Sequence, residues 1–270
     1  MTQLTGNLTW AGLTHPGKIR TNNEDTFLAL AFGAQDLTFL GKSGESCTES
    51  QDFVFAVSDG MGGAKSGEFA SRIAVDKITR LLPKSFRYRA QGLESGFVDI
   101  LGELYSSIHQ ELLKLGRYYT ECAGMGATLS LGWVSPGRFF FGHVGDSRIY
   151  HLPADGPLRQ ISEDHTYVGW LRRQGKINER EARNHPRKNL LNQALGAGHQ
   201  FVEPNFGSVI CEPGDRFLLC TDGLIDGLWD QRIEEYLRTP NLVEASNILI
   251  REALDNSGRD NLTVMTVEVH

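Results

Sequence analysis

The stretch Asp52–Ala74, DFVFAVSDGMGGAKSGEFASRIA, begins with an apolar run and then places an aspartate among glycines. Asp59 follows the run Phe53–Val57, so its carboxylate lies at the mouth of a buried element, where a lone charge is costly unless it is paired. Gly60, and the glycines at 62 and 63, let the backbone approach a ligand or adopt left-handed torsions. Two interpretations remain open: a turn that holds a small ligand, or an Asp-Gly turn that only redirects the chain.

Length and composition favour one globular domain. The chain has 270 residues, of which 40% are apolar and 22% charged, and no linker or repeat divides residues 1–270. No run approaches the roughly 18 apolar residues of a membrane span, and the first residues lack the pattern of a secretory signal. The net charge of −6 without a basic run argues against nucleic-acid binding. We therefore expect a cytoplasmic monomer with neither nucleic-acid nor membrane partners.

Hydrophobic periodicity predicts strands at both ends of the chain and helices between them. A helix is expected over 68–82, ended by Pro83, and a longer one over 94–115. Strands at 126–134, 138–144 and 147–152 are expected to form an antiparallel meander, and 41–50 a polar loop. Residues 166–189, polar and weakly periodic, predict a partly helical flap. Further strands are expected at 8–15, 26–32, 53–58, 201–210, 216–221 and 261–269, with a helix at 242–256.

Acidic residues recur in Gly- or Asn-rich turns that border strands. They are Glu24 and Asp25, Asp59, Asp222, and Asp260. If these strands end at one sheet edge, the carboxylates converge and repel one another unless they are protonated or bind metal. Oxygen ligands without a His or Cys cluster favour magnesium or manganese over zinc. Two ions about 3.5 to 4 Å apart would polarise a phosphoryl group and activate water.

Each turn also has a plain structural interpretation. The two Asp-Gly pairs can be hairpin or helix-capping turns, the segment at Glu24 a solvated loop, and Asp260 a turn cap. Their recurrence weakens this interpretation, because acidic residues are not preferred at strand ends. The sequence carries no G-x-S-x-G, phosphatase-type Cys-Arg or P-loop motif, which agrees with hydrolysis without a covalent protein intermediate.

Seven motifs in order carry a resemblance to a known family. They are RTNNED (20–25), VSDGMGGAKSGEFAS (57–71), GMGATL (124–129), GHVGDSRIY (142–150), EDHT (163–166), LLCTDGL (218–224) and GRDNLTV (258–264). Together they resemble the metal-dependent serine/threonine protein phosphatases of the PP2C (PPM) type, especially bacterial ones. The resemblance implies an α+β fold, a four-layer αββα sandwich in which two antiparallel β-sheets are flanked by helices, with the metal centre at one edge.

The resemblance also implies a dinuclear Mn²⁺ or Mg²⁺ centre. Asp59 would bridge both ions, and the carbonyl of Gly60 would bind one of them. Glu24 or Asp25 would hold the second ion, with the other of these two acting through water. The ligands completing the first ion would be Asp222 and Asp260.

Three further expectations follow from the resemblance. Arg20 would bind the substrate phosphate through its guanidinium; the alternative is an exposed surface arginine. Asp146 would hold a third ion together with Asp222, or would be a hairpin-turn residue. We interpret Thr128 and the pair at 164–165 as structural. Cations of the flap would contact phosphopeptides or form a solvated face.

The sequence departs from the family pattern at Met61, where eukaryotic members carry a histidine proposed as the general acid. A thioether cannot donate a proton, so the donor must be a bound water or another side chain, with His165 and His15 as candidates. The 33–52 insertion is long enough for an extra hairpin, and the sequence does not indicate its role.

The function predicted is removal of phosphate from serine or threonine by metal-activated water, acting on proteins phosphorylated by a cognate kinase. Two alternatives stay open. One is a pseudophosphatase that uses the fold as a binding or regulatory module, which the intact aspartates argue against. The other is a phosphatase of an anti-sigma antagonist in a partner-switching pathway, although such enzymes carry extra sensory domains.

Overall fold

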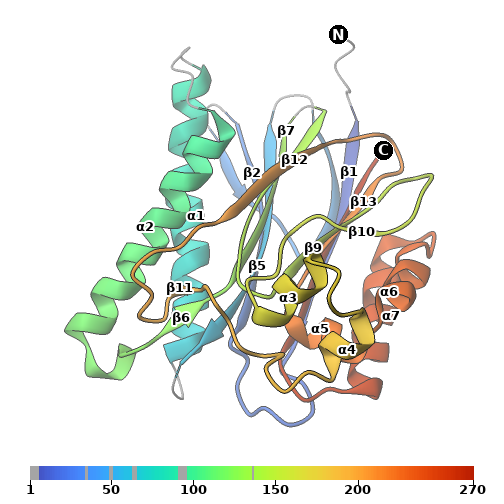
Figure 1. Ribbon diagram of the computed structural model, residues 1–270. Helices are drawn as coiled ribbons and strands as arrows, with labels where there is room; N and C mark the ends of the chain where they lie inside the picture. Colours follow the sequence, from blue (N-terminus) through green and yellow to red (C-terminus); the bar gives the residue numbers. More distant parts are fainter. Residues whose placement is uncertain (1–5, 34–35, 49–50, 63–65, 91–95, 136) are drawn as a thin grey trace.

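Two antiparallel sheets pack face to face in the computed structural model, which describes residues 6–33, 36–48, 51–62, 66–90, 96–135 and 137–270, without the side chains of 83–90 (Figure 1). In the first sheet β14 pairs with β1 on one side and with β13 on the other. Its strands, in spatial order, are β10 (Arg159–Gln160), β9 (Arg148–Leu152), β13 (Arg216–Cys220), β14 (Leu262–Val269), β1 (Asn7–His15) and β4 (Ser43–Cys47).

The second sheet is built around strand β5, which pairs with three neighbours. Its main order is β11 (Leu195–Gly196), β6 (Gly126–Ala127), β5 (Asp52–Met61), β7 (Leu129–Ser135), β8 (Arg138–Val144) and β12 (Asn205–Ile210), with β2 (Asp25–Phe32) between β5 and β3 (Leu37–Phe39). Side chains of β5 alternate: Phe53 and Phe55 enter the core between the sheets, whereas Val54 packs under the helices. Burial on both faces explains the continuous apolar run at 53–57.

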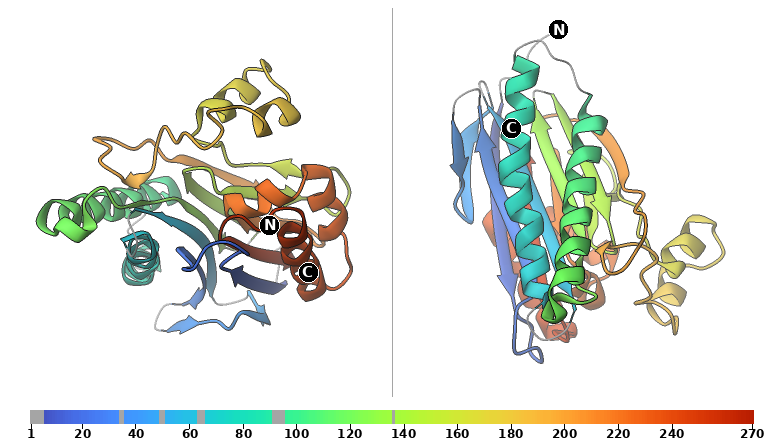
Figure 2. Two further views of the ribbon diagram at one scale, coloured as in Figure 1. Left: turned by 90° about the horizontal axis from the view of Figure 1, so that it is seen from below. Right: turned by 90° about the vertical axis from the view of Figure 1, so that its left-hand side faces the viewer.

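Helices cover both outer faces, which confirms the αββα sandwich (Figures 1 and 2). α1 (Ser66–Ala90) and α2 (Phe97–Tyr118) pack on the second sheet, and a short 3-10 turn, Thr120–Cys122, follows α2. The helices beside the first sheet are α5 (Asp222–Gly227), α6 (Asp230–Leu237) and α7 (Leu242–Asn256). The flap contains α3 (Tyr167–Arg173) and α4 (Glu179–Arg183). None of the described helices combines the length and apolar character of a membrane-spanning segment.

Helix α1 does not end at Pro83 as predicted; it continues to Ala90. A proline inside a helix removes one amide donor and its ring crowds the carbonyl four residues earlier, at a cost of about 3 kcal/mol or more. Ile78 and Leu82, immediately before it, are fully buried against the second sheet. We attribute the continuation of the helix to this packing, which outweighs the local preference of proline.

The predicted meander holds only for its first two strands. β7 and β8 are paired, but β9 belongs to the other sheet, where it pairs with β13. Gly145, at φ +114°, adopts a conformation that other residues rarely reach and turns the chain between the sheets. Asp146 is therefore at a crossover and not in a hairpin.

The insertion at 33–52 also differs from its prediction. Ser43–Cys47, expected to be loop, forms β4 on β1, while β3 extends the other sheet on β2. The indole of Trp10 donates to the carbonyl of Gly41 at 2.9 Å, which fixes the connection. The insertion therefore joins the two sheets along one side of the sandwich; residues 34–35 and 49–50 are outside the described range.

Candidate metal centre

The predicted acidic residues come together because the strands that carry them end at one edge of the sandwich. Asp25 begins β2 and is the direct cross-strand partner of Asp59 on β5. Asp222 begins α5 immediately after β13, and Asp260 immediately precedes the segment leading into β14. Asp59 was predicted to lie in a turn, but it lies within β5. The strand continues through Gly60 and Met61 because these two residues pair with β6. Gly63 lies outside the described residues.

Mutual repulsion and burial raise the pKa values of these carboxyl groups. Burial, followed by the charge of Asp260 and Glu24, raises the pKa of Asp25 to about 7, against the opposing effect of two hydroxyl hydrogen bonds. Burial and the neighbours Asp25, Asp222, Asp146 and Asp260 raise the pKa of Asp59 well above its ordinary value. Burial, followed by the charges of Asp146, Asp260, Asp226 and Asp25, raises the pKa of Asp222 well above its ordinary value. The raised pKa values show that the negative charge of these carboxylates at the edge is not balanced by nearby positive charge.

Asp25 is fixed from one side only. Its Oδ2 accepts hydrogen bonds from the hydroxyls of Thr221 at 2.8 Å and Thr263 at 2.7 Å. Its Oδ1 is buried and has no hydrogen-bond partner among the described residues. A buried oxygen without a donor is costly unless a cation or water approaches it. Asp25 is thus held in one orientation with one oxygen left for a ligand.

Two glycines leave room for further oxygen ligands beside this pair. A Cβ on Gly67 would lie 2.7 Å from the carbonyl oxygen of Gly60 and 2.8 Å from the carboxyl carbon of Glu24. The amide of Gly60 donates to the carbonyl of Glu24 at 3.1 Å, so the carbonyl of Gly60 and the carboxylate of Glu24 are kept on neighbouring segments. Carboxylate and carbonyl oxygens are the ligands that Mg²⁺ and Mn²⁺ prefer. The residues present fit such ions.

The acidic residues lie at one edge of the sandwich, but their side chains do not form a ready-made ligand set. Across the described ranges, no three His, Cys, Asp or Glu side chains stand in a ligating arrangement. Asp260 explains part of this, because its Oδ2 accepts from Arg20 at 2.8 Å and its Oδ1 from the amide of Asn261 at 2.8 Å.

Asn261, which the sequence analysis did not single out, fastens the segment that carries Arg20. Its Oδ1 accepts from the amide of Glu24 at 2.8 Å. Its Nδ2 donates to the carbonyls of Pro16 at 2.9 Å and Asn22 at 2.8 Å. Buried Asn261 therefore fixes Arg20 and Glu24 relative to Asp260. The only signal in the sequence is an amide directly after the acidic turn.

Thr128 supports both Asp59 and the crossover loop, in keeping with the structural role predicted for it. Its hydroxyl accepts a hydrogen bond from the amide of Asp59 at 2.9 Å and shares a second hydrogen bond with Ser147 Oγ at 2.7 Å. Burial, followed by the charge of Asp164, raises the pKa of Asp146 to about 6. The crossover thus brings Asp146 to the edge of the acidic cluster.

The two histidines considered as proton donors occupy different places. His165 lies at the crossover, where its Nδ1 accepts from the amide of Gly145 at 3.1 Å, and burial lowers its pKa. His15 ends β1, and its Nδ1 accepts from the amide of Gly17 at 3.0 Å. Of the two, His165 is the one beside Asp146. Met61, held in β5 opposite Gly126, offers no proton.

A small cavity of about 70 Å³ lies between this edge and the flap. Asp146 and Asp222 line it from the sandwich, and Arg172, Arg183 and Lys188 line it from the flap. Asp226, one helical turn after Asp222, also faces it. The cavity establishes that the flap abuts the acidic edge.

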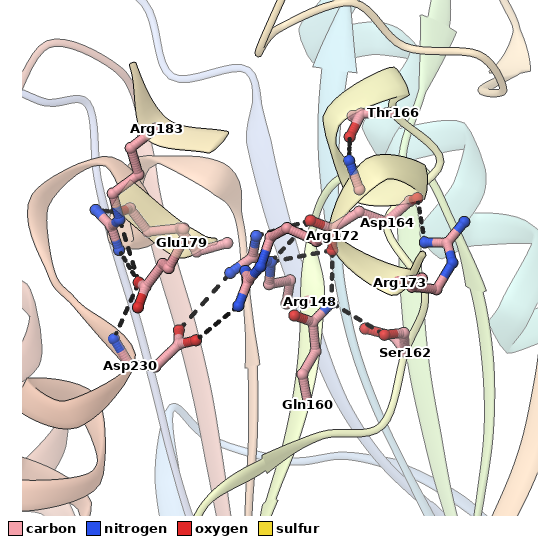
Figure 3. A network of polar contacts seen from close by, with 12 residues as sticks. Arg148, Gln160, Ser162, Asp164, Thr166, Arg172, Arg173, Glu179, Arg183 and Asp230 are labelled. Carbon is pink, nitrogen blue, oxygen red and sulfur yellow. Dashed lines mark hydrogen bonds and ion pairs between the residues drawn. The ribbon is translucent and has the colours of Figure 1, made fainter. Parts of the chain in front are cut away.

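A buried ion pair anchors the root of the flap (Figure 3). Arg148 Nε and Nη2 donate to both carboxylate oxygens of Asp164 at 2.7 to 3.1 Å, and Arg148 Nη1 donates to Tyr150 Oη at 2.9 Å. Tyr150 in turn donates to Asp230 at 2.9 Å, and Asp230 is 3.5 Å from Arg172 of the flap. Asp164 and Arg148 are thus structural, as predicted for Asp164, and Arg148 lies two residues from Asp146.

Comparison with known proteins agrees with this arrangement. Residues 35–255 match the family model described as protein phosphatase 2C. The serine/threonine protein phosphatase PstP of Mycobacterium tuberculosis is 34% identical over 272 residues, which is all of this chain but only 46% of PstP. The chain thus spans about half the length of that relative. The serine/threonine phosphatase stp of Listeria innocua is 32% identical over 257 residues, covering 94% of this chain and 93% of stp.

Solved structures give the same result. The crystal structure of M. tuberculosis PstP superposes with a TM-score of 0.79 at 30% identity, covering 97% of this chain and 98% of that one. A second structure, of the PstP catalytic domain in complex with two manganese ions, gives 0.77 at 31% identity, with 98% and 99% covered. With the sandwich, the acidic edge and the seven ordered motifs, these matches establish that the chain belongs to the protein phosphatase 2C family.

Proposed function

We propose that the chain hydrolyses phosphoserine and phosphothreonine in proteins, with two Mn²⁺ or Mg²⁺ ions at the acidic edge. The observation that carries the proposal is the pairing of Asp25 with Asp59, together with the buried Oδ1 of Asp25, which has no hydrogen-bond donor among the described residues. In this proposal Asp59 would be a ligand of both ions. The other ligands are Glu24, Asp25, the Gly60 carbonyl, Asp222 and Asp260, with Asp146 and Asp222 available for a third ion.

The ions, when bound, supply Lewis-acid polarisation of the phosphoryl group and a water of lowered pKa. The residues of the chain orient the reactants. Thr221 and Thr263 hold Asp25 in one rotamer. Arg20 places a guanidinium at the same edge, and its planar donor set matches the oxygens of a phosphate. Asn261 keeps the backbone beneath Arg20 in register with Asp260.

The proposed substrates are proteins phosphorylated on serine or threonine, made by a cognate kinase. The support comes from the relatives, which are named serine/threonine phosphatases, and from the half-exposed guanidinium of Arg20 at the acidic edge. All four cysteines are free, which suits a reducing cytoplasm, where we expect the enzyme to act as a monomer.

The test is hydrolysis of p-nitrophenyl phosphate and of a phosphothreonine peptide by protein first stripped with EDTA and then supplied with Mn²⁺. We expect activity only with the metal, and a loss of at least about a thousandfold in kcat in Asp59→Asn with an unchanged circular dichroism spectrum. Asp255→Asn is the matched control, because Asp255 is exposed and, among the residues that the structure describes, pairs with Lys18 alone. Metal-independent activity, or full activity in Asp59→Asn, would contradict the proposal.

A further inference from the structure

The flap has a charge opposite to that of the rest of the molecule. Residues 166–189 contain seven lysines and arginines and two glutamates, a net charge of +5, although the whole chain carries −6. The remainder therefore carries −11. A positive segment beside an acidic edge would be explained by structure alone if every cation served as a counter-ion to the sandwich.

Four of the seven cations have carboxylate partners, and two of these partners lie on the helices α5 and α6. Arg172 pairs with Asp230 at 3.5 Å and Lys188 with Asp226 at 2.8 Å. Arg173 pairs with Glu163 at 3.2 Å. Arg183 pairs with Glu179 at 3.0 Å (Figure 3). Arg183 also donates to the carbonyls of Ile225 and Leu228. The contacts of Arg172, Arg183 and Lys188 with Asp230, Asp226 and the two carbonyls dock the flap onto α5 and α6.

The other three cations, Lys176, Arg180 and Arg187, are exposed, and within the described part of the chain no carboxylate lies at ion-pair distance from them. Two of them rest on aromatic rings. Lys176 Nζ lies 4.4 Å above the ring of Trp170, and the Arg187 guanidinium lies 5.8 Å from that of Tyr167. The flap projects from the side of the sandwich, so this face is presented to solvent (Figure 2).

The aromatic rings join these cations into one surface. Tyr167 and Trp170 stack with centroids 6.2 Å apart, which gives a continuous row from Lys176 to Arg187. Trp170 is 41% exposed, a large value for the ring of a tryptophan that only supports the flap. Contact with a ring restricts a long cationic side chain before any partner arrives, so less rotamer entropy is lost on binding. We call Tyr167, Trp170, Lys176 and Arg187 the flap cation row.

We propose that the flap cation row binds an acidic segment of the phosphoprotein substrate, lying close in sequence to the phosphorylated residue. The inference rests on the proposed function. The chemistry recognised is anionic side chains, either carboxylates or a second phosphate, on a polypeptide whose phosphorylated residue occupies the acidic edge. The flap abuts that edge across the cavity between Asp222 and Arg183, so a chain leaving the site passes the flap.

A peptide is favoured over a nucleic acid or an anionic membrane because the row is short and the rest of the chain carries a net negative charge. The charge of −11 outside the flap would repel an extended polyanion or an anionic bilayer. A peptide segment needs only a local match of two or three charges. Such a contact at the rim of a site is screened by salt, which gives it a clear experimental signature.

The test compares two phosphothreonine peptides of equal length, one with glutamates flanking the phosphothreonine and one with glutamines, together with p-nitrophenyl phosphate. In Mn²⁺-loaded wild type at low salt, we expect kcat/KM to be about tenfold higher for the acidic peptide than for the glutamine peptide, because its KM is lower. This preference should be lost at 0.5 M NaCl. In Lys176→Gln/Arg187→Gln the preference should fall to about twofold while p-nitrophenyl phosphate turnover is unchanged. Lys42→Gln/Arg138→Gln, which removes two exposed cations elsewhere, should keep the wild-type preference.

Equal kcat/KM for the two peptides in wild type would overturn the inference, as would an unchanged preference in the Lys176→Gln/Arg187→Gln variant. Binding of a single-stranded RNA or of phosphatidylserine vesicles that depends on these two cations, with no peptide preference, would also overturn it. Failure of the proposed function is recognised separately, because p-nitrophenyl phosphate would then not be hydrolysed by any of the three proteins.

Discussion

The molecule contains two pairs of buried charged residues, one at the flap root and one at the acidic edge, and they differ in whether their charges are compensated. At the flap root, Arg148 donates bidentate hydrogen bonds to Asp164. Arg148 also donates to the hydroxyl of Tyr150, and Asp164 also accepts from the amide of Gln160. At the acidic edge, Asp25 and Asp59 face each other across two strands, and one oxygen of Asp25 has no partner among the described residues. The first arrangement is complete without a ligand, and the second is not.

The difference separates a structural charge from a functional one. Burial raises the pKa of Asp25 and Asp59, which means that their ionised forms destabilise the folded chain. No such strain remains at Arg148, because a charged partner lies within 2.7 Å. A protein tolerates uncompensated buried charge where a ligand restores the balance, and the acidic edge is therefore the part of the fold whose stability depends on what binds there.

The largest expected effect is that of Asp222→Asn, which separates activity from stability. Removing this carboxylate should lower kcat with Mn²⁺ by about a thousandfold, equivalent to about 4 kcal/mol. It should raise the free energy of unfolding of EDTA-treated protein by about 1 kcal/mol, because the neighbours Asp146 and Asp260 lose a repelling charge. Phosphatase assays and urea titrations measure the two effects. A metal-free variant less stable than wild type would show that Asp222 is a structural group.

Arg148→Met should give the opposite result at the flap root. The variant leaves Asp164 buried without its partner, and we expect the free energy of unfolding to fall by about 3 to 5 kcal/mol. Urea titration of the single variant and of Arg148→Met/Asp164→Leu provides the check, because the double variant removes both charges and should recover most of the loss. If the double variant were no more stable than the single one, the pair would not be the source of the effect.

The smallest expected effect is a pH dependence of the metal-free chain. The folded pKa of Asp25, about 7, is above its unfolded value of 3.8, so its contribution to stability is fully present below pH 3.8 and is lost as the pH rises through about 7. Between pH 5 and 8 we expect the EDTA-treated protein to lose about 1 to 3 kcal/mol. Saturating Mn²⁺ should abolish or reverse this slope. Urea titrations at several pH values provide the measurement, and a metal-free stability that rises from pH 5 to 8 would contradict the account.

Much of the acidic edge was predictable, because the motifs that carry it are local. Asp59, Asp222 and Asp260 each follow or precede a strong strand signal, and convergence needs only that the strands end together. The direct pairing of Asp25 with Asp59 was not predictable, since register between strands about 30 residues apart depends on the whole sheet. Gly67 and Asn261 were missed because their roles are contacts with distant backbone.

The fold was predicted at the level of its layers and less well at its connections. The β9 strand reads like a third strand of a meander, and only the left-handed Gly145 takes it to the other sheet. The continuation of α1 past Pro83 and the pairing of β4 with β1 were missed for the same reason, because tertiary packing overrides local preference. In the flap, the excess of cations is visible in the sequence. The sequence does not show that Arg172 and Lys188 pair with carboxylates of α6 and α5, because these partners are distant along the chain.

The central claim is that the acidic edge is a site for two divalent ions organised by Asp59. Isothermal titration of Mn²⁺ into EDTA-treated wild type, Asp59→Asn and Asp255→Asn tests it without depending on turnover. We predict two ions bound by wild type and by Asp255→Asn, and a loss of at least one ion together with about a hundredfold weaker binding of any other in Asp59→Asn. Equal stoichiometry and affinity in all three proteins would contradict the account.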